Sequence, residues 1–168
     1  MSDASQFRFL PQFLGLTVIY EMSVFDFKSK TVWGNTLHFN VLRGKVLVLM
    51  NVASKWGRTK RTYEFLKTLR RNEKVVVILF PSAEFKGQEF LEDKDIATFL
   101  DEKFGINPKE MPNLVVLERS NIRKDPTNPI WQYLKTNSDK DPHLKTRWNF
   151  STTFIVTGDD HITRLDDV

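Results

Sequence analysis

Residues 45–81 read KVLVLMNVASKWGRTKRTYEFLKTLRRNEKVVVILFP, and this stretch decides the fold. Its two ends, 45–52 and 74–80, are apolar runs rich in Val and Leu, which is typical of strands buried on both faces. Between them, apolar residues recur at helical spacing over 59–71, and Thr59 can cap the start of that helix. Strand, helix and strand predict a βαβ unit with parallel strands and a right-handed crossover.

The remainder of the chain also alternates strands and helices. Turn residues and apolar periodicity predict a hairpin of 24–27 with 36–39 around Gly34-Asn35, a helix over 93–104 that ends at Gly105, a short apolar segment over 114–117, a short helix over 130–135 that follows Pro129, and a final hairpin of 152–157 with 161–165 around the turn 158–160. The sum is an α/β domain with a mixed sheet flanked by helices.

Composition narrows the class of protein. A chain of 168 residues with 40% hydrophobic and 27% charged residues is expected to fold as one soluble domain, since no apolar run reaches the roughly 20 residues that cross a bilayer. Cys is absent, which excludes disulfides and every mechanism with a thiol nucleophile. The three His residues are scattered, and we expect no metal site and no cofactor.

Residues 1–22 are richer in apolar side chains than a free tail usually is. They fit neither a signal peptide nor an organellar presequence, and Pro11 interrupts any helix, so we expect an N-terminal extension that lies against a partner surface or packs on its own domain, 23–168. The side chains that we expect to contact a partner there are Phe7, Phe9, Phe13, Leu14 and Tyr20.

Three motifs in order carry a resemblance to a known family. They read NVASKWGRTK at 51–60, FPSAEFKGQE at 80–89, and RWNF at 147–150 followed by FIV at 154–156. This sequence resembles the glutathione peroxidases, whose corresponding motifs contain Asn-Val-Ala-Ser, Phe-Pro-Cys-Asn-Gln-Phe and Lys-Trp-Asn-Phe. The resemblance implies a thioredoxin-like fold, in agreement with the mixed sheet predicted above.

The resemblance also implies that the chemistry is lost. In the family a Cys or selenocysteine at the start of a helix reduces a peroxide; here that position is Trp56, whose indole has no ionisable nucleophile. Of the three helper positions, Trp148 and Asn149 persist, but the Gln position holds Glu84, which is expected to place a negative charge where a thiolate would form. Ser82 stands where the family often has Cys.

The chain ends soon after the last predicted hairpin, where family members usually add a terminal helix. We therefore expect a degenerate member, without that helix, whose family positions are retained only in part.

Residues 55–74 form a basic stretch with eight Lys and Arg residues against two Glu residues. Lys60, Lys67 and Arg71 are the side chains that we expect to meet RNA phosphates there. The other interpretation is a solvated helix face with local ion pairs, such as Glu64 with Lys60.

These observations predict a catalytically inactive glutathione-peroxidase-like protein that acts as a structural subunit of a multiprotein, mitochondrial assembly, with a cytoplasmic location as the alternative. A second hypothesis is an RNA-contacting component of a ribonucleoprotein such as a mitochondrial ribosome. A third is a residual peroxidase in which residue 56 is a misassigned selenocysteine, because the UGA codon is read as Trp in some genetic codes.

Overall fold

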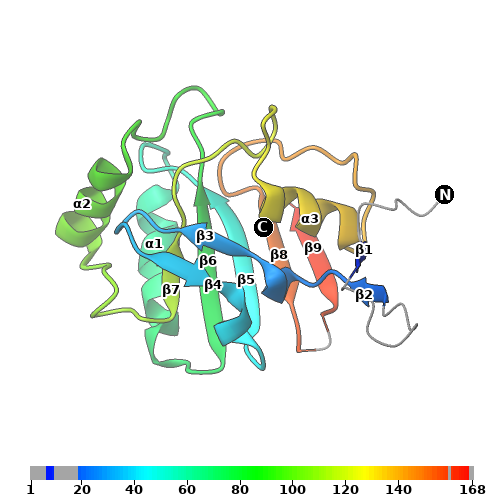
Figure 1. Cartoon of the computed structure of the whole chain (residues 1–168). Coiled ribbons are helices and arrows are strands. Elements are labelled where there is room, and N and C mark those ends of the chain that lie inside the picture. Colours follow the sequence, from blue (N-terminus) through cyan, green and yellow to red (C-terminus); the bar gives the residue numbers. More distant parts are fainter. Residues whose placement is uncertain (1–6, 10–18, 159, 167–168) are drawn as a thin grey trace.

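A central five-stranded sheet organises the computed structural model, which describes residues 7–9, 19–158 and 160–166 (Figure 1). Its strand order is β7-β6-β5-β8-β9. The strands are β5 (Val46–Val52), β6 (Val75–Pro81), β7 (Leu114–Val116), β8 (Thr152–Val156) and β9 (Ile162–Asp166). β5, β6 and β7 are parallel, whereas β8 pairs antiparallel with β5 and β9 antiparallel with β8. The predicted mixed sheet is confirmed.

The predicted βαβ unit is also confirmed. β5 and β6 pair in parallel over their full length, with Val46 opposite Val75 and Val52 opposite Pro81. The crossover between them contains α1 (Thr59–Lys67), which is shorter than expected because residues 68–71 tighten into the 3-10 helix η4. Pairing of two strands that are apolar on both faces requires cover on both sides of the sheet.

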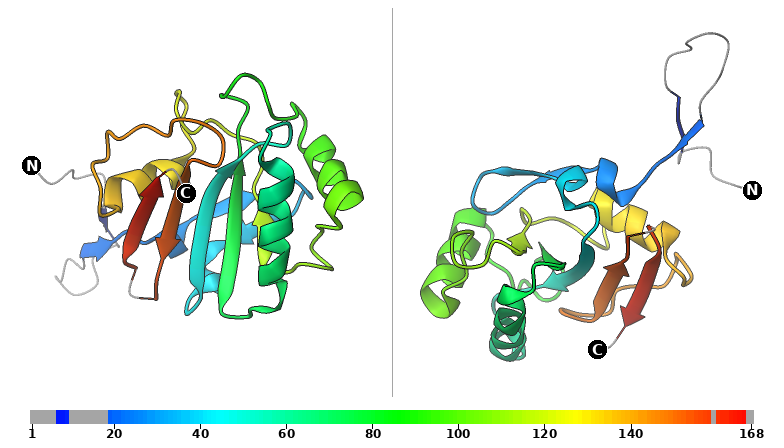
Figure 2. Two further views of the ribbon diagram at one scale, coloured as in Figure 1. Left: turned by 180° about the vertical axis from the view of Figure 1, so that it is seen from behind. Right: turned by 90° about the horizontal axis from the view of Figure 1, so that it is seen from below.

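Helices α1 and α2 (Asp93–Phe104) cover one face of the sheet (Figures 1 and 2). On the other face lie α3 (Pro129–Asn137) and the hairpin of β3 (Lys28–Lys30) and β4 (Thr36–His38). Alternate residues of the central strands supply the two cores, so Ile78 and Phe80 face α3 whereas Val77 and Leu79 face α1 and α2. Trp131 of α3 is fully buried with Phe80 and Phe154 at ring-centroid distances of 5.0 and 5.1 Å.

The predicted ends of the helices are largely as expected. α2 ends at Gly105, which adopts the left-handed conformation with φ 64°, and α3 begins with Pro129 after Asn128, whose side chain caps the first turn. Thr59 was expected to cap α1, but it is the first helical residue, and Arg58 precedes it without a side-chain cap. Its hydroxyl has another role, described below.

The predicted first hairpin is wrong in its first strand. Residues 24–26 form the 3-10 turn η2 because Ser23 and Asp26 cap each other reciprocally, and pairing begins only with β3 (Lys28–Lys30). β3 pairs with β4 (Thr36–His38), and Gly34 has the expected positive φ, 85°. Phe39 belongs to the 3-10 helix η3 (Phe39–Leu42) instead of the strand.

The N-terminal extension contains two short strands, β1 (Phe7–Phe9) and β2 (Ile19–Glu21), which pair antiparallel. No strand was predicted in this segment, because its apolar residues do not alternate. The β1–β2 ribbon stands apart from the five-stranded sheet (Figure 2). The boundary after residue 22 stays a prediction. In the described part of the chain, no helix has both the length and the apolar character needed to traverse a bilayer.

Candidate functional site

The loop that follows β5 carries Trp56 and leads directly into α1. The Thr59 hydroxyl accepts a hydrogen bond from the Trp56 backbone N–H at 3.1 Å and donates one to the Ala53 carbonyl at 2.7 Å. The Thr59 N–H in turn donates to the Trp56 carbonyl at 3.1 Å. Thr59 is itself buried, so this ring of contacts holds residue 56 immediately before the positive end of the α1 dipole.

The Trp56 indole is half-buried and packs against the apolar cluster beneath α1 and α2. Its Nε1 is buried and has no hydrogen-bond partner among the described residues. A cavity of about 390 Å³ lies beside it, lined in part by Phe99 and Phe104 of α2 and by Lys60 and Lys103. An indole offers this cavity aromatic surface and one N–H donor, but no group that attacks a peroxide.

The buried side chain of Glu89 anchors the loop that carries Trp56. Its carboxylate is 2% exposed and accepts hydrogen bonds from the backbone N–H groups of Ser54 at 3.1 Å and Phe90 at 2.8 Å. Burial raises the pKa of Glu89, although these two N–H groups and the positive charge of Lys55 act in the opposite direction. The neighbouring Lys55 N–H donates to the Gln88 carbonyl at 2.9 Å, so residues 88 and 89 together position the Trp56 loop.

Tyr63 on α1 is a second buried titratable group beside this loop. Its ring packs at 5.1 Å from the Phe104 ring and 6.3 Å from the Phe150 ring, and its hydroxyl has no hydrogen-bond partner among the described residues. Burial, and after it the negative charge of Glu89, raises the pKa of Tyr63 well above its ordinary value. Tyr63 is therefore a neutral core residue at physiological pH.

Asn149 and Trp148 lie in the turn that precedes β8. Asn149 is 1% exposed, and its Nδ2 donates to Gln88 Oε1 at 2.9 Å, whereas its Oδ1 has no partner in the described ranges. Trp148 leaves 41% of its surface exposed. Its carbonyl accepts a hydrogen bond from Asn51 Nδ2 at 2.8 Å, and the Asn51 Oδ1 accepts one from the Thr152 N–H at 3.0 Å.

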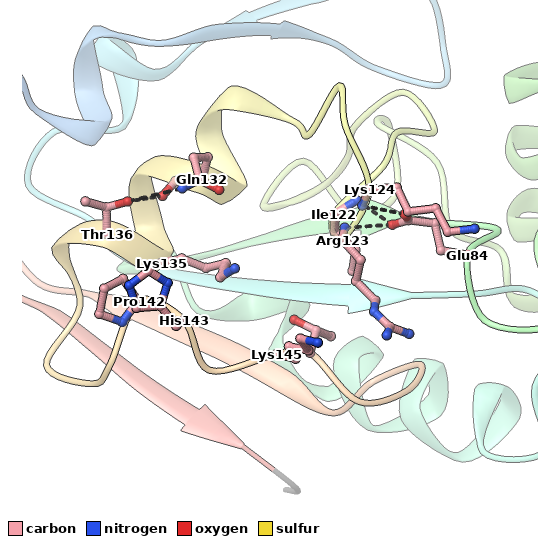
Figure 3. Close-up of a pocket in the computed structure, with 11 residues that line it drawn as sticks. Glu84, Ile122, Arg123, Lys124, Gln132, Lys135, Thr136, Pro142, His143 and Lys145 are labelled. Atoms are coloured by element: carbon pink, nitrogen blue, oxygen red, sulfur yellow. Dashed lines mark hydrogen bonds between the residues drawn. The ribbon is translucent and has the colours of Figure 1, made fainter. Parts of the chain in front are cut away.

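Glu84 has a different role from the one predicted. Its Oε2 accepts the backbone N–H groups of Ile122 at 2.6 Å and Arg123 at 2.9 Å, and its Oε1 accepts that of Lys124 at 2.8 Å (Figure 3). Ser82 adds a longer hydrogen bond from its hydroxyl at 3.3 Å. The carboxylate lies against the 122–124 loop, so the expectation that its charge occupies the site of residue 56 is wrong.

The four predicted site residues therefore do not lie together in one site. Trp56 lines the cavity beside α2, Glu84 lines another cavity beside α3, and neither Trp148 nor Asn149 lines either of them. Within the described ranges, no three His, Asp or Glu side chains come together as metal ligands do. Asn149 stays connected to the Trp56 loop through Gln88, whereas Glu84 belongs to a separate site.

The family model of the glutathione peroxidases matches residues 24–135, which is more than half of the chain. The chain belongs to the glutathione peroxidase family. Glutathione peroxidase 1 of Caenorhabditis elegans is 32% identical over 143 residues, covering 83% of each chain. The glutathione peroxidase-like peroxiredoxin gpx1 of Schizosaccharomyces pombe is 31% identical over 135 residues, covering 79% of this chain and 80% of that one.

Solved structures confirm the thioredoxin-like fold of this glutathione peroxidase family member. T. cruzi GPX1 aligns with a TM-score of 0.60 at 21% identity and covers 87% of both chains. A secreted Mycobacterium tuberculosis disulfide oxidoreductase aligns with a TM-score of 0.55 at 14% identity and covers 86% of both chains. The fold therefore extends beyond the peroxidases.

Two residues of the family motifs were missed as site residues by the sequence reasoning. Asn51 and Glu89 lie within the first and second motifs, but their spacing along the chain gave no indication that they hold backbone groups of distant segments. Neither residue carried a local signal, because Asn and Glu side chains are mostly exposed in proteins and their burial here depends on distant backbone partners.

The predicted partner-binding residues of the extension are described only in part. Phe7 and Phe9 lie in β1 and Tyr20 lies in β2, where it pairs with Arg8. Phe13 and Leu14 lie outside the described residues. The structure brings the strands of Phe7, Phe9 and Tyr20 together, and their role in partner binding stays a prediction.

The predicted basic surface is divided between two places. Lys60 lines the cavity beside Trp56, whereas Lys67 and Arg71 line a shallow depression at the other end of α1. Glu64 forms an ion pair with Lys67 at 3.4 Å, so the expected pair of Glu64 with Lys60 is replaced by an i,i+3 pair. The cations at 55, 58, 60, 61, 70, 71 and 74 are exposed.

Proposed function

We propose that this chain is a non-catalytic member of the glutathione peroxidase family that serves as a structural subunit of a larger protein assembly. The observation that carries the proposal is Trp56, a half-buried indole at the position where the family resemblance expects the reactive Cys or selenocysteine, in a chain with no Cys. The indole cannot form a sulfenic or selenenic acid with a peroxide, and the chain contains no thiol that could do so.

The surroundings of Trp56 support this proposal. The loop is held in place by Thr59 and Glu89, so the scaffold around the reactive position persists without the reactive atom. Glu84 is committed to the 122–124 loop and does not assist residue 56. A fold of this kind, freed from catalysis, still provides surfaces for other proteins.

The β1–β2 ribbon supports the role in an assembly. It stands apart from the sheet, and a two-stranded ribbon alone is at best marginally stable in water, so contact with another protein would stabilise it (Figure 2). The residues that we propose to contact that partner are Phe7, Phe9, Phe13, Leu14 and Tyr20. The proposal includes a mitochondrial location, which subcellular fractionation tests.

The first experiment measures peroxide turnover by the purified protein with glutathione or thioredoxin as reductant. We expect no turnover above the buffer rate, whereas Trp56→Cys is expected to form a sulfenic acid with peroxide, because a thiol before a helix N-terminus has a lowered pKa. Robust turnover by the unsubstituted protein contradicts the proposal. A tryptic fragment of residues 56–58 with the mass of selenocysteine in place of Trp would support the residual-peroxidase alternative instead.

The second experiment separates native complexes from a gentle lysate and identifies by mass spectrometry what co-migrates with the protein. We expect migration far above the 19.7 kDa of the single chain. Combined Phe7→Ser and Phe9→Ser substitutions are expected to release the protein, whereas Val41→Ser, at a residue exposed elsewhere on the domain, is not. Migration of the unsubstituted protein as a monomer contradicts the proposal.

A second candidate function, contact with RNA, is favoured by the exposed cations of 55–74. Charge reversal at Lys60, Lys67 and Arg71 is then expected to weaken binding strongly and to reduce its salt dependence. The matched control reverses Lys28, Lys30 and Lys109, which are exposed on other parts of the surface and change the net charge equally. An unchanged salt dependence in the first variant contradicts this alternative.

A further inference from the structure

A cavity of about 640 Å³ lies between α3, the 122–124 loop and the segment 142–146, apart from the Trp56 loop. In Figure 3, the side chains of Lys135, Arg123 and Lys145 extend from these three elements into the same space. The volume falls within the roughly 300–1,000 Å³ of pockets that bind small molecules.

Positive charge in this cavity is not matched by negative charge. Arg123, Lys124, Lys135 and Lys145 line it, and none of these four side chains forms an ion pair with a described residue. Glu84 is the one acid in the lining, and its oxygens already accept three backbone N–H groups of the 122–124 loop. Four cations against this single carboxylate leave an excess of three positive charges.

Lys135 is the cation closest to the core. It is half-buried on α3, and burial, followed by the positive charge of Arg164, lowers the pKa of Lys135. Arg164 is itself fully buried, and its charge is paired with the Asp166 carboxylate. A bound anion would replace the water that Lys135 has lost and offset the repulsion from Arg164.

Thr146 supplies an independent observation. The residue is 2% exposed and lines the cavity, and its Oγ1 has no hydrogen-bond partner among the residues that the structure describes. A buried hydroxyl without a partner is costly, so groups of this kind are usually paired by protein, water or ligand. An oxygen of an anionic ligand would accept a hydrogen bond from the Thr146 hydroxyl.

We propose that this cavity binds a small molecule that carries two linked phosphate groups. An excess of three positive charges matches a diphosphate, since each phosphate monoester carries about −1.5 to −2 at pH 7, whereas a carboxylate carries only one negative charge. Arg123 can bind phosphate oxygens in a bidentate manner, and the three lysines act as point charges. Ile122 and Pro142 in the lining provide apolar surface for an organic group.

The test is isothermal titration calorimetry of the full chain at physiological ionic strength with inorganic pyrophosphate as the probe. We expect saturable binding at one site, weakened at least about tenfold by combined Lys135→Gln and Lys145→Gln substitutions, because hydrogen bonds to charged groups are lost. The matched control, Lys30→Gln with Lys109→Gln, removes the same charge from exposed positions outside the lining of this cavity and should bind within about twofold of the unsubstituted protein.

Three results would overturn the proposal. The first is the absence of saturable pyrophosphate binding, and the second is equal weakening in the control, which would show attraction to net charge alone. The third is binding of citrate as tight as that of pyrophosphate, which would show an anion site without preference for phosphate. Tighter binding of ADP than of pyrophosphate would identify the ligand as an organic diphosphate, and the reverse would identify it as inorganic.

Thr146→Val separates a ligand contact from a structural role. Val has nearly the same shape, so loss of an unpartnered hydroxyl should leave the melting temperature unchanged or raise it, while pyrophosphate affinity falls about tenfold. Unchanged affinity in a folded Thr146→Val variant would overturn the role of this hydroxyl. Circular dichroism of every variant establishes that weaker binding does not arise from unfolding.

Discussion

Asn51 at the end of β5 donates a hydrogen bond from its Nδ2 to the backbone carbonyl of Trp148 at 2.8 Å, although the two residues are 97 positions apart. The Asn51 Oδ1 also accepts the Thr152 N–H at 3.0 Å, and its own carbonyl accepts the Phe150 N–H at 3.0 Å. One fully buried side chain therefore determines how the segment before β8 returns to the central sheet.

Replacing this side chain should destabilise the domain. Asn51→Ala removes the side-chain partner of the buried Thr152 N–H and one of the two hydrogen bonds to the Trp148 carbonyl, which also accepts the Ser151 N–H at 3.3 Å. We expect this to cost about 1–3 kcal/mol of unfolding free energy. Urea denaturation followed by circular dichroism measures it. Asn40→Ala, at an exposed position, is the control and should change the unfolding free energy by less than about 0.5 kcal/mol. Equal effects of the two substitutions would contradict the role given to Asn51.

Glu84→Gln should loosen the 122–124 loop. The amide has one acceptor oxygen where the carboxylate has two, and the hydrogen bonds to it lose their charge assistance. We expect hydrogen exchange of the Ile122, Arg123 and Lys124 amides to accelerate about tenfold or more. Glu102→Gln, exposed on α2, is the matched control. Unchanged exchange at these three amides in the Glu84 variant would refute the anchoring role.

We expect Trp56 to stabilise the domain through the packing of its ring and not through a hydrogen bond from its N–H. Trp56→Phe removes a buried donor that has no partner in the described part of the chain and should change the unfolding free energy by less than about 1 kcal/mol. Trp56→Ala removes the packing against the cluster below α1 and α2 and should cost about 1–3 kcal/mol, less than a fully buried Trp. Urea unfolding followed by circular dichroism compares the two. A similar cost for both would show that Nε1 has a partner.

Glu89 should make the domain less stable as the pH rises from acid toward neutral. Burial raises the pKa of Glu89 above its ordinary value of 4.5, so between these two pKa values the folded state holds a proton that the unfolded state has released. The contribution of Glu89 is greatest below pH 4.5 and is lost as the pH rises through the folded-state pKa.

The Glu89→Gln variant isolates this effect. The unfolding free energy of the unsubstituted protein minus that of the variant should decrease between about pH 4 and pH 7. Denaturant unfolding at a series of pH values measures the difference. A constant difference across this range would mean that Glu89 titrates as an exposed acid does.

The central elements were predictable because their information is local. The apolar runs that became β5 and β6, the helical spacing of α1 and the Gly105 cap of α2 each lie within one segment of sequence. The first hairpin failed for a local reason too. Ser23 and Asp26 cap each other, and this capping favours a 3-10 helix over 24–26 instead of the strand that the apolar residues there predicted.

By itself, the sequence determined that the chain has no Cys and that three of its segments resemble motifs of the glutathione peroxidases, with Trp56 inside the first of them. The tertiary structure decided that Glu84 anchors the 122–124 loop, that Glu89 is buried against the loop of Trp56, and that four cations without an ion pair to any described residue line one cavity. The first two outcomes depend on hydrogen bonds between residues 35 or more positions apart, and contacts of this kind leave no periodic pattern in the chain.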